Sequence, residues 1–114
     1  MQYALLIYTN ETADAQAAPE EQQAVFAGYT AFGEQFKDKI AGGEALLPTS
    51  SATTVRVRNG KTLTTDGPFA ETKEQLGGFY LVNADNLDEA ISIAAHIPGA
   101  ASGEVEVRPV MVFE

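Results

Sequence analysis

The first eight residues form an apolar run that continues on both faces of an extended chain. One face carries Tyr3, Leu5 and Ile7, and the other carries Ala4, Leu6 and Tyr8. A strand that is apolar on both faces needs cover on both sides. The run has neither a basic n-region nor a small-residue cleavage site, so we expect it to belong to the mature domain and the protein to be cytoplasmic.

The chain has 114 residues and 45% hydrophobic content, which predicts one compact domain over residues 1–114. No apolar run reaches the roughly 20 residues of a membrane-spanning helix. With no cysteine and one histidine, thiolate, iron–sulfur and multi-histidine metal sites are excluded within one chain, and we expect no metal and no cofactor. The formal charge of −9 disfavours nucleic acid and membrane surfaces as partners.

Two helices are predicted on either side of a β-rich centre. The first follows a polar loop over Thr9–Ala18, begins at Pro19 and is stopped by Gly42-Gly43. Its apolar stripe is Val25, Tyr29, Phe32, Phe36 and Ile40. The aromatic members of this stripe, with Phe26, are typical of core packing, and a platform for a flat ligand is the alternative.

The second helix is predicted to begin at Asn86 as N-cap, with Glu89 completing a capping box, and to end at Pro98-Gly99. Its expected buried face is Leu87, Ala90, Ile91 and Ala94. His96 falls on the opposite side, at the helix C-terminus, where a cation is favourable. We therefore expect a surface histidine and not a haem or metal ligand.

A β-hairpin is predicted over Thr53–Arg58 and Lys61–Thr65, joined by Asn59-Gly60. A two-residue loop pairs Arg58 with Lys61 and Arg56 with Leu63, which gathers Arg56, Arg58 and Lys61 on one face. Such charges are typical of a solvated edge hairpin. The alternative is a patch that attracts an anionic ligand or an acidic partner.

Two further strands are predicted over Gly78–Val82 and Val105–Phe113. The order is then β-α-β-hairpin-β-α-β, an α+β, ferredoxin-like (split βαβ) antiparallel sheet with an inserted β-hairpin. Its two helices cover one face only, and Tyr8, Tyr80 and Val112 or their neighbours are expected on the other. We predict that a second subunit covers this apolar face, which makes the protein a homodimer.

The segment between hairpin and third main strand combines ionisable groups with glycine and proline, as functional loops do. Its sequence, Asp66-Gly67-Pro68-Phe69-Ala70-Glu71-Thr72-Lys73-Glu74 followed by Gly77-Gly78-Phe79, resembles the signature of the DGPF-domain family within the YCII-related group. The resemblance extends to Asn86-Leu87-Asp88-Glu89-Ala90, Ile97-Pro98 and Val105-Glu106-Val107-Arg108-Pro109, and so covers nearly the whole chain.

The resemblance implies a dimeric ferredoxin-like fold and a bacterial protein associated with extracytoplasmic-function sigma factors. The wider YCII-related group includes a dehydrochlorinase of a chlorinated aromatic and has a proposed histidine–aspartate pair. The histidine is implied shortly after the first strand, where this chain has Asn10, Glu11 and Thr12. The pair therefore does not carry over, and only Asp66 matches an acidic position of the signature.

Asp66 before Gly67 is first a turn-former, whose carboxylate accepts backbone N–H bonds. The functional alternative makes it a catalytic general acid/base, with a set of ligand-binding side chains around it. That set is Tyr8, Glu71, Lys73, Glu74, Tyr80 and Arg108. The charged members of the loop are equally consistent with an internal salt-bridge set that holds the loop shut.

Three functions follow, and whether the protein is an enzyme stays open. The first is a small-molecule binding or regulatory protein with a cleft near the DGPF loop for a small anionic ligand. The second is a cofactor-independent isomerase, lyase or oxygenase of small aromatic or unsaturated acids that uses Asp66. The third is an interaction module for an extracytoplasmic-function sigma factor.

Overall fold

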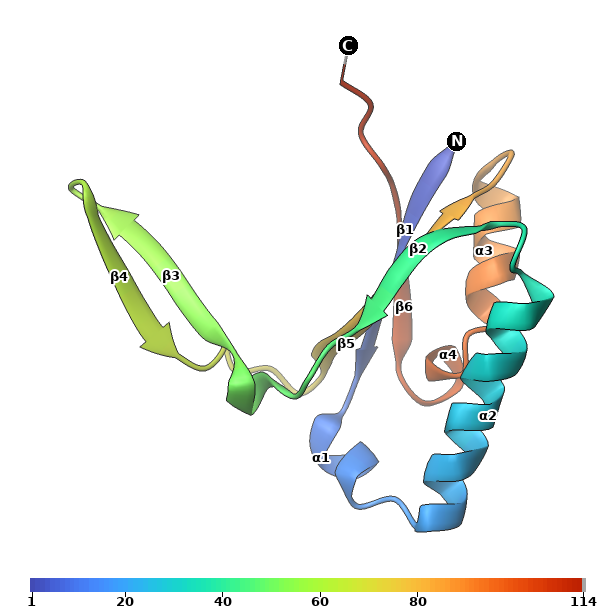
Figure 1. Ribbon diagram of the computed structural model, residues 1–114, viewed down its shortest axis with the longest axis horizontal. Helices are drawn as coiled ribbons and strands as arrows, with labels where there is room; N and C mark the ends of the chain where they lie inside the picture. Colours follow the sequence, from blue (N-terminus) through green and yellow to red (C-terminus); the bar gives the residue numbers. More distant parts are fainter. Residues whose placement is uncertain (114) are drawn as a thin grey trace.

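The computed structural model describes residues 1–113 and has two parts, a four-stranded sheet backed by helices and a two-stranded arm (Figure 1). The elements are β1 (Gln2–Thr9), α1 (Glu11–Ala15), α2 (Pro19–Gln35), β2 (Ile40–Ala45), a 3-10 turn (Thr49–Ser51), β3 (Thr53–Arg58), β4 (Lys61–Asp66), β5 (Gln75–Asn83), α3 (Leu87–Ala95), α4 (Gly99–Ser102) and β6 (Glu104–Pro109). The main sheet has the antiparallel order β2-β5-β1-β6. The predicted α+β, ferredoxin-like class is therefore confirmed.

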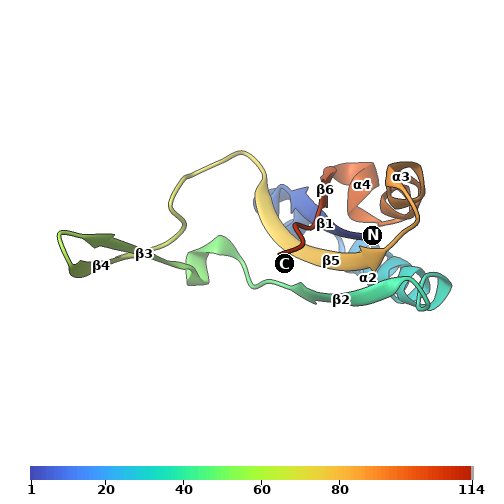
Figure 2. The same ribbon diagram turned by 90° about the horizontal axis from the view of Figure 1, so that it is seen from above.

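The central strand β1 has one covered and one open face. Tyr3, Leu5 and Ile7 are buried, and Figure 2 shows α2, α3 and α4 on one side of the sheet only. Ala4, Leu6 and Tyr8 are half-buried on the opposite side. The two-faced apolar character read from the sequence is therefore real, and one face lacks cover in a single chain.

Tyr80 lies on the covered face, contrary to the expectation that placed it on the open one. The register pairs Tyr80 with Leu5 and Phe79 with Leu6, and residues directly opposite share a face. The ring of Tyr80 packs on Phe32 with centroids 4.9 Å apart. Its neighbour Phe79 takes the open face instead, because a shift of one residue moves a side chain to the other side of a sheet.

Two predictions about the first half of the chain need correction. The polar stretch Thr9–Ala18 is not all loop, because it contains α1, which Asn10 caps by accepting a 2.9 Å hydrogen bond from Ala13 N–H. The helix α2 begins at Pro19 as predicted but ends at Gln35, well before Gly42-Gly43. The apolar pattern misled because Ile40, already in β2, still packs on the core.

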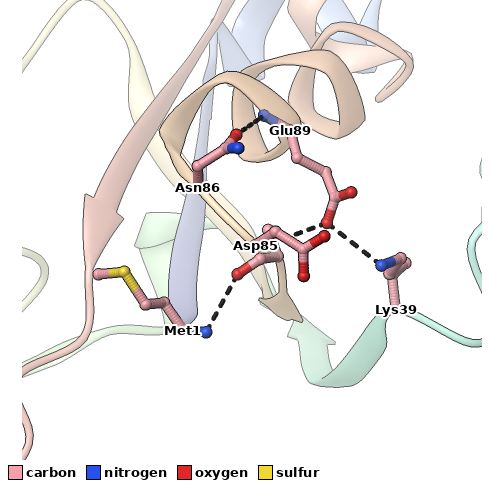
Figure 3. A network of polar contacts seen from close by, with 6 residues as sticks. Met1, Lys39, Asp85, Asn86 and Glu89 are labelled. Carbon is pink, nitrogen blue, oxygen red and sulfur yellow. Dashed lines mark hydrogen bonds and ion pairs between the residues drawn. The ribbon is translucent and has the colours of Figure 1, made fainter.

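The N-terminus of α3 is confirmed as a capped helix start (Figure 3). Asn86 Oδ1 accepts from Glu89 N–H at 2.9 Å, while the Glu89 carboxylate accepts from Asp85 N–H at 3.0 Å and from Lys39 Nζ at 3.2 Å. In addition, the N-terminal amine of Met1 donates to Ala84 O at 3.0 Å. These contacts fasten β1 and the turn before β2 to the start of α3.

The buried face and the end of α3 differ in part from the prediction. Ala90 and Ala94 are buried as expected, but Leu87 and Ile91 are 49% and 48% exposed, so this part is wrong. Ile93 and Ile97 are buried in their place. The helix ends at Ala95, and Gly99 opens the separate short helix α4 instead of closing α3.

The last strand is shorter than predicted. It ends at Pro109 and not at Phe113, because proline has no backbone N–H to continue the ladder. The tail beyond it stays apolar but uncovered, and Val112 is 82% exposed. Val112 therefore lies beyond the sheet face on which it was expected.

The hairpin has the predicted register, with Arg58 opposite Lys61 and Arg56 opposite Leu63. Its turn residues Asn59 and Gly60 have φ of 53° and 75°, which is the left-handed geometry of a type I′ turn. The hairpin is not an edge of the main sheet. It forms an arm of its own that projects away from the helices (Figures 1 and 2).

Candidate functional site

A cleft of about 630 Å³ opens between α2 and the end of the sheet where β1 finishes and β5 begins. We call it the α2 cleft. Its floor comes from β1, β2 and β5, and its walls come from α1, α2 and the start of α4. The lining residues are Ile7, Thr9, Asp14, Ala17, Gln22, Val25, Phe26, Tyr29, Gly43, Glu44, Ala45, Gly77, Gly78, Phe79, Tyr80, Pro98, Gly99 and Ser102.

The lining is largely apolar and carries no positive charge. Among the lining residues given above none is Lys, Arg or His, and the acidic ones are Asp14 and Glu44. Glu44 pairs with Phe79 and therefore directs its side chain to the open face, which leaves the Asp14 carboxylate at the α2 cleft. An anionic ligand therefore finds no counter-charge in the lining of one chain. This disfavours the expected anionic ligand in the α2 cleft of a single subunit.

Tyr29 is the central polar group of the α2 cleft. Burial raises the pKa of its phenol, and the Gly99 backbone N–H against the phenol oxygen offsets part of this effect. Tyr80 and Asp14 raise the same pKa further. The phenol is therefore protonated at neutral pH, and its O–H donates to no other residue in the range 1–113.

The close approach of Tyr29 to α4 depends on Gly99. A Cβ atom at this position would lie 2.9 Å from Tyr29 Oη and 2.8 Å from Ile7 Cγ2. Both distances are too short for a real Cβ contact, so any larger residue displaces the phenol or the strand. Glycine at position 99 thus keeps the back of the α2 cleft open.

The aromatic stripe of α2 divides between core and cleft. Phe32 is 2% exposed and packs on Phe36 and Tyr80. Phe26 is 75% exposed and lines the α2 cleft together with Tyr29. The core interpretation holds for Phe32 and Phe36, whereas Phe26 and Tyr29 are available to a flat ligand.

Of the seven residues proposed from the sequence, Tyr80 alone lines the α2 cleft. Burial raises the pKa of its phenol, so Tyr80 offers a second O–H donor beside Tyr29. Among the remaining positions, Arg108 is exposed on β6 opposite Ala4, and Tyr8 is half-buried at the end of β1. Glu71 and Lys73 are exposed in the loop before β5.

Asp66 lies at the root of the arm, where its backbone pairs with Thr53 at the end of β4. The turn after it is held by Gly67, whose N–H donates to Ala52 O at 2.7 Å and whose C=O accepts from Thr54 Oγ1 at 2.8 Å. The Asp66 carboxylate is exposed and accepts no hydrogen bond from the rest of the described chain. Backbone groups and Thr54 therefore hold the turn, which the Asp66 carboxylate was expected to do. The catalytic role of Asp66 stays a prediction.

The charged loop is not closed by ion pairs of its own. In the range 1–113 the one salt bridge joins Lys39 to Glu89. Glu74 instead meets Glu104, the first residue of β6, and a hydrogen bond between the two carboxyl groups raises the pKa of Glu74. Partial burial and repulsion from Glu104 add to this rise, and Lys73 opposes it.

In this chain, the residues at the position where the resemblance implies a histidine stabilise the local structure. Asn10 caps α1, and the Glu11 carboxylate accepts from both the N–H and the hydroxyl of Thr49 at 2.8 Å each. The N–H of Glu11 in turn donates to Gln75 Oε1 at 3.0 Å. Glu11 thereby binds both chain segments that lead to the arm.

His96 is exposed and caps the end of α3, with Nδ1 2.8 Å from Ser92 O and its ring against Phe36. The prediction of a surface helix-end histidine is therefore confirmed. No group of three His, Cys, Asp or Glu side chains within residues 1–113 is arranged to hold a metal ion. None of the helices in this range has the length and apolar character to cross a membrane.

The α2 cleft includes the end of the DGPF signature, Gly77-Gly78-Phe79, but also segments that the sequence did not connect with it. Tyr29, Phe26 and Gly99 were missed as a group because α2 and α4 lie far apart in sequence. The one available signal was the aromatic stripe of α2, which runs past the buried Phe32 toward the helix N-terminus. Phe26 and Tyr29 extend this stripe but are less buried than Phe32, which lies in the core.

Comparison with known proteins agrees with the fold. The sequence matches the model of the YCII-related domain over residues 1–114. It is 38% identical over 118 residues, covering 100% of this chain and 95% of the other, to an uncharacterised protein of Rhizobium meliloti (strain 1021). The fold is similar to that of 5-chloro-2-hydroxyhydroquinone dehydrochlorinase from Burkholderia phenoliruptrix AC1100, solved in complex with 2,5-dihydroxybenzoquinone. The TM-score is 0.59 at 17% identity, covering 97% of this chain and 94% of that one.

Proposed function

Because this chain belongs to the YCII-related domain family, we propose that it is a small-molecule binding or regulatory protein whose ligand occupies the α2 cleft. The observation that carries this proposal is an apolar cleft of about 630 Å³ into which two protonated phenols are built. Ligand sites are typically apolar, with a few placed polar groups, and have volumes of roughly 300–1,000 Å³. The α2 cleft meets each of these criteria.

The ligand class that fits best is a small, uncharged planar ring with oxygen atoms that accept hydrogen bonds. Phe26 and Tyr29 offer aromatic surface for stacking, and Tyr29 and Tyr80 offer O–H donors. The Asp14 carboxylate repels an anion. The dehydrochlorinase of similar fold was solved with a ring of this shape, 2,5-dihydroxybenzoquinone, which supports the choice of probe.

The test is an NMR titration of the protein with 1,4-dihydroxybenzene, using benzoate as the anionic comparison. We expect the uncharged ring to shift resonances of residues that line the α2 cleft and benzoate to leave them unchanged. Removing one hydrogen bond costs about 0.5–1.5 kcal/mol, so Tyr29→Phe is expected to weaken binding about three- to tenfold. Tyr8→Phe is the matched control, since Tyr8 does not line the α2 cleft.

Two results would contradict the proposal. One is the absence of any shift with 1,4-dihydroxybenzene at millimolar concentration. The other is an equal loss of affinity in Tyr8→Phe and Tyr29→Phe, which would place the ring elsewhere.

A cofactor-independent lyase or isomerase acting on the bound ring is the second candidate. It is favoured by the presence of the Tyr29 phenol and the Asp14 carboxylate in the lining of the same cleft, because such a pair can exchange protons with a bound ring. Chromatography of uncharged, oxygen-bearing ring compounds after incubation with the protein distinguishes turnover from binding. Product formation that is lost in Tyr29→Phe and retained in Asp66→Asn assigns the proton transfer to the α2 cleft. The reverse pattern assigns it to Asp66.

A further inference from the structure

The arm formed by β3 and β4 has no packing partner in a single chain. The two strands pair only with each other, and Val55 and Val57 are 59% and 60% exposed on one side while Leu63 is 50% exposed on the other. An isolated two-stranded hairpin is marginally stable in water. The arm is nevertheless fastened at its root by Glu11 and Thr49, which favours a surface held ready for a partner.

The chain also exposes far more surface than a compact monomer of its mass. Its accessible surface is 8162 Å², whereas a monomer of 12.1 kDa is expected to expose about 6,000 Å². Its radius of gyration is 16.1 Å, against about 13 Å for a compact domain of this length. An excess of about 2,000 Å² per chain corresponds to the interfaces of obligate homodimers.

Large apolar side chains contribute to this exposed surface. Many of them lie on the arm, its two connections and the C-terminal tail, while Phe26, Leu87 and Ile91 are exposed on the helices. Leu47, Phe69, Met111 and Phe113 are each more than 70% exposed. The open face of the sheet adds the half-buried Leu6, Phe79 and Leu81.

Opposite charges gather in two separate patches, one basic and one acidic. The arm carries Arg56, Arg58 and Lys61 on one face. The edge strand β6 carries Glu104 and Glu106 opposite Tyr8 and Leu6 of the open face, with Glu74 against Glu104. We call Glu74, Glu104 and Glu106 the acidic patch.

The acidic patch is only partly neutralised by nearby cations: Arg108 lies on the same face of β6, two residues after Glu106, and Lys73 precedes Glu74. The neighbouring Glu104 carboxyl group raises the pKa of Glu74, and Lys73 gives a weaker opposing effect. No salt bridge forms at this patch within residues 1–113. A guanidinium group placed there would pair with both carboxylates in the fork geometry that Arg offers.

We propose that two copies of this chain exchange arms, so that the basic face of each arm, Arg56, Arg58 and Lys61, docks on the acidic patch of the other copy. The observations favour a second copy of this chain as the partner, because one chain carries both the basic face of the arm and the acidic patch. A two-fold axis then satisfies both contacts at once, as isologous dimers require. The exchanged arms also bring apolar surface to the uncovered side of the sheet.

The test is a charge exchange between two variants of the full chain. The arm variant is Arg56→Glu with Arg58→Glu, and the patch variant is Glu104→Arg with Glu106→Arg. Each reversal places like charges at both contacts of its own homodimer, so the dimer dissociation constant is expected to rise at least tenfold by analytical ultracentrifugation. Mixing the two variants restores opposite charges at both contacts of the heterodimer. Native mass spectrometry of the mixture is therefore expected to show heterodimers in excess of either homodimer.

The control for net charge combines Lys37→Glu with Gln16→Glu and Gln23→Glu, which changes the total charge as much as the arm variant does, on exposed residues of the helical side. It is expected to dimerise like the wild type. Circular dichroism checks that each variant folds, and the single substitutions Arg58→Glu and Glu106→Arg replace any variant that does not. A monomeric wild type at micromolar concentration, unchanged dimerisation of the arm variant, or a mixture without heterodimers would overturn the proposal. The first of these results would leave the arm to a different protein, such as a sigma factor.

Discussion

At the scale of single residues, the α2 cleft owes its chemistry to the meeting of Tyr29 with Gly99. The missing Cβ of Gly99 lets the phenol reach the start of α4, and the partial burial that results raises its pKa. Tyr80, on the floor of the same cleft, has its pKa raised by burial alone. Both phenols therefore stay hydrogen-bond donors at a pH where an exposed tyrosine begins to ionise.

These two pKa shifts predict a loss of stability at alkaline pH. Because the folded state holds the two protons more tightly than the unfolded state, the stabilising contribution is complete below the ordinary tyrosine pKa of about 10 and is lost as the pH rises through the folded value. We expect Tyr29→Phe with Tyr80→Phe to show a smaller fall in melting temperature between about pH 9 and 11 than the wild type. Thermal melts by circular dichroism measure this.

Tyr8→Phe is the comparison for that experiment, since it removes a phenol that does not line the α2 cleft. An equal alkaline fall in wild type and double variant would mean that the two cleft phenols do not bind their protons more tightly in the folded state.

At the scale of secondary-structure elements, Glu11 decides how the arm is held. Its carboxylate accepts two hydrogen bonds from Thr49, and its N–H reaches Gln75 on the returning strand. Hydrogen bonds to charged groups contribute about 1.5–3 kcal/mol when they are shielded from water. Since Glu11 is half-buried, we expect its contribution at the low end of this range.

Glu11→Ala is therefore predicted to release the root of the arm without unfolding the sheet. Hydrogen exchange should become faster over residues 46–52, and β1 and β5 should keep their protection. The expected loss of unfolding free energy is about 1–2 kcal/mol, measured by urea denaturation. Glu34→Ala, which removes an exposed carboxylate from α2, is the control. Equal exchange rates in both variants would contradict the anchoring role.

Sequence patterns predicted the elements whose signals are local. The type I′ turn at Asn59-Gly60 fixes the register of the arm, and Asn86 marks the start of α3 through one side-chain hydrogen bond. The end of α2 was missed, because Ile40 continues the apolar period after the helix has ended at Gln35. The helix and the strand bury this stripe against the same core, so periodicity alone does not separate them.

The site was harder to predict than the fold. Asp66 drew attention because its loop has the most distinctive local sequence, yet it lies at the root of the arm and is not among the residues that line the α2 cleft. The cleft itself is assembled from six segments, and the key approach of Tyr29 to Gly99 depends on how α2 and α4 pack. Such a contact has no local sequence signal. Tyr80 was among the residues proposed from the sequence, but it was expected on the open face and lies on the covered one.

At the scale of the whole molecule, surface and charge lead to the same conclusion. An arm whose strand residues are nearly all exposed would be a liability in a monomer, since unpaired strand edges invite aggregation. Here the arm carries Arg56, Arg58 and Lys61, and the rest of the chain carries most of the sixteen acidic residues. This separation of charge favours pairing between copies over random edge-to-edge association.

Thermal stability is therefore predicted to depend on protein concentration. If folding and arm exchange are coupled, a dimer of two such chains unfolds with roughly 150 kcal/mol of enthalpy, so the melting temperature should rise by about 3 °C for each tenfold increase in concentration. Differential scanning calorimetry over a hundredfold range measures the slope. The arm variant Arg56→Glu with Arg58→Glu should have a slope near zero, because its unfolding no longer includes dissociation. A wild type that melts at one temperature throughout the range would show that the chain is stable as a monomer, and the large exposed surface would then belong to a contact with another protein.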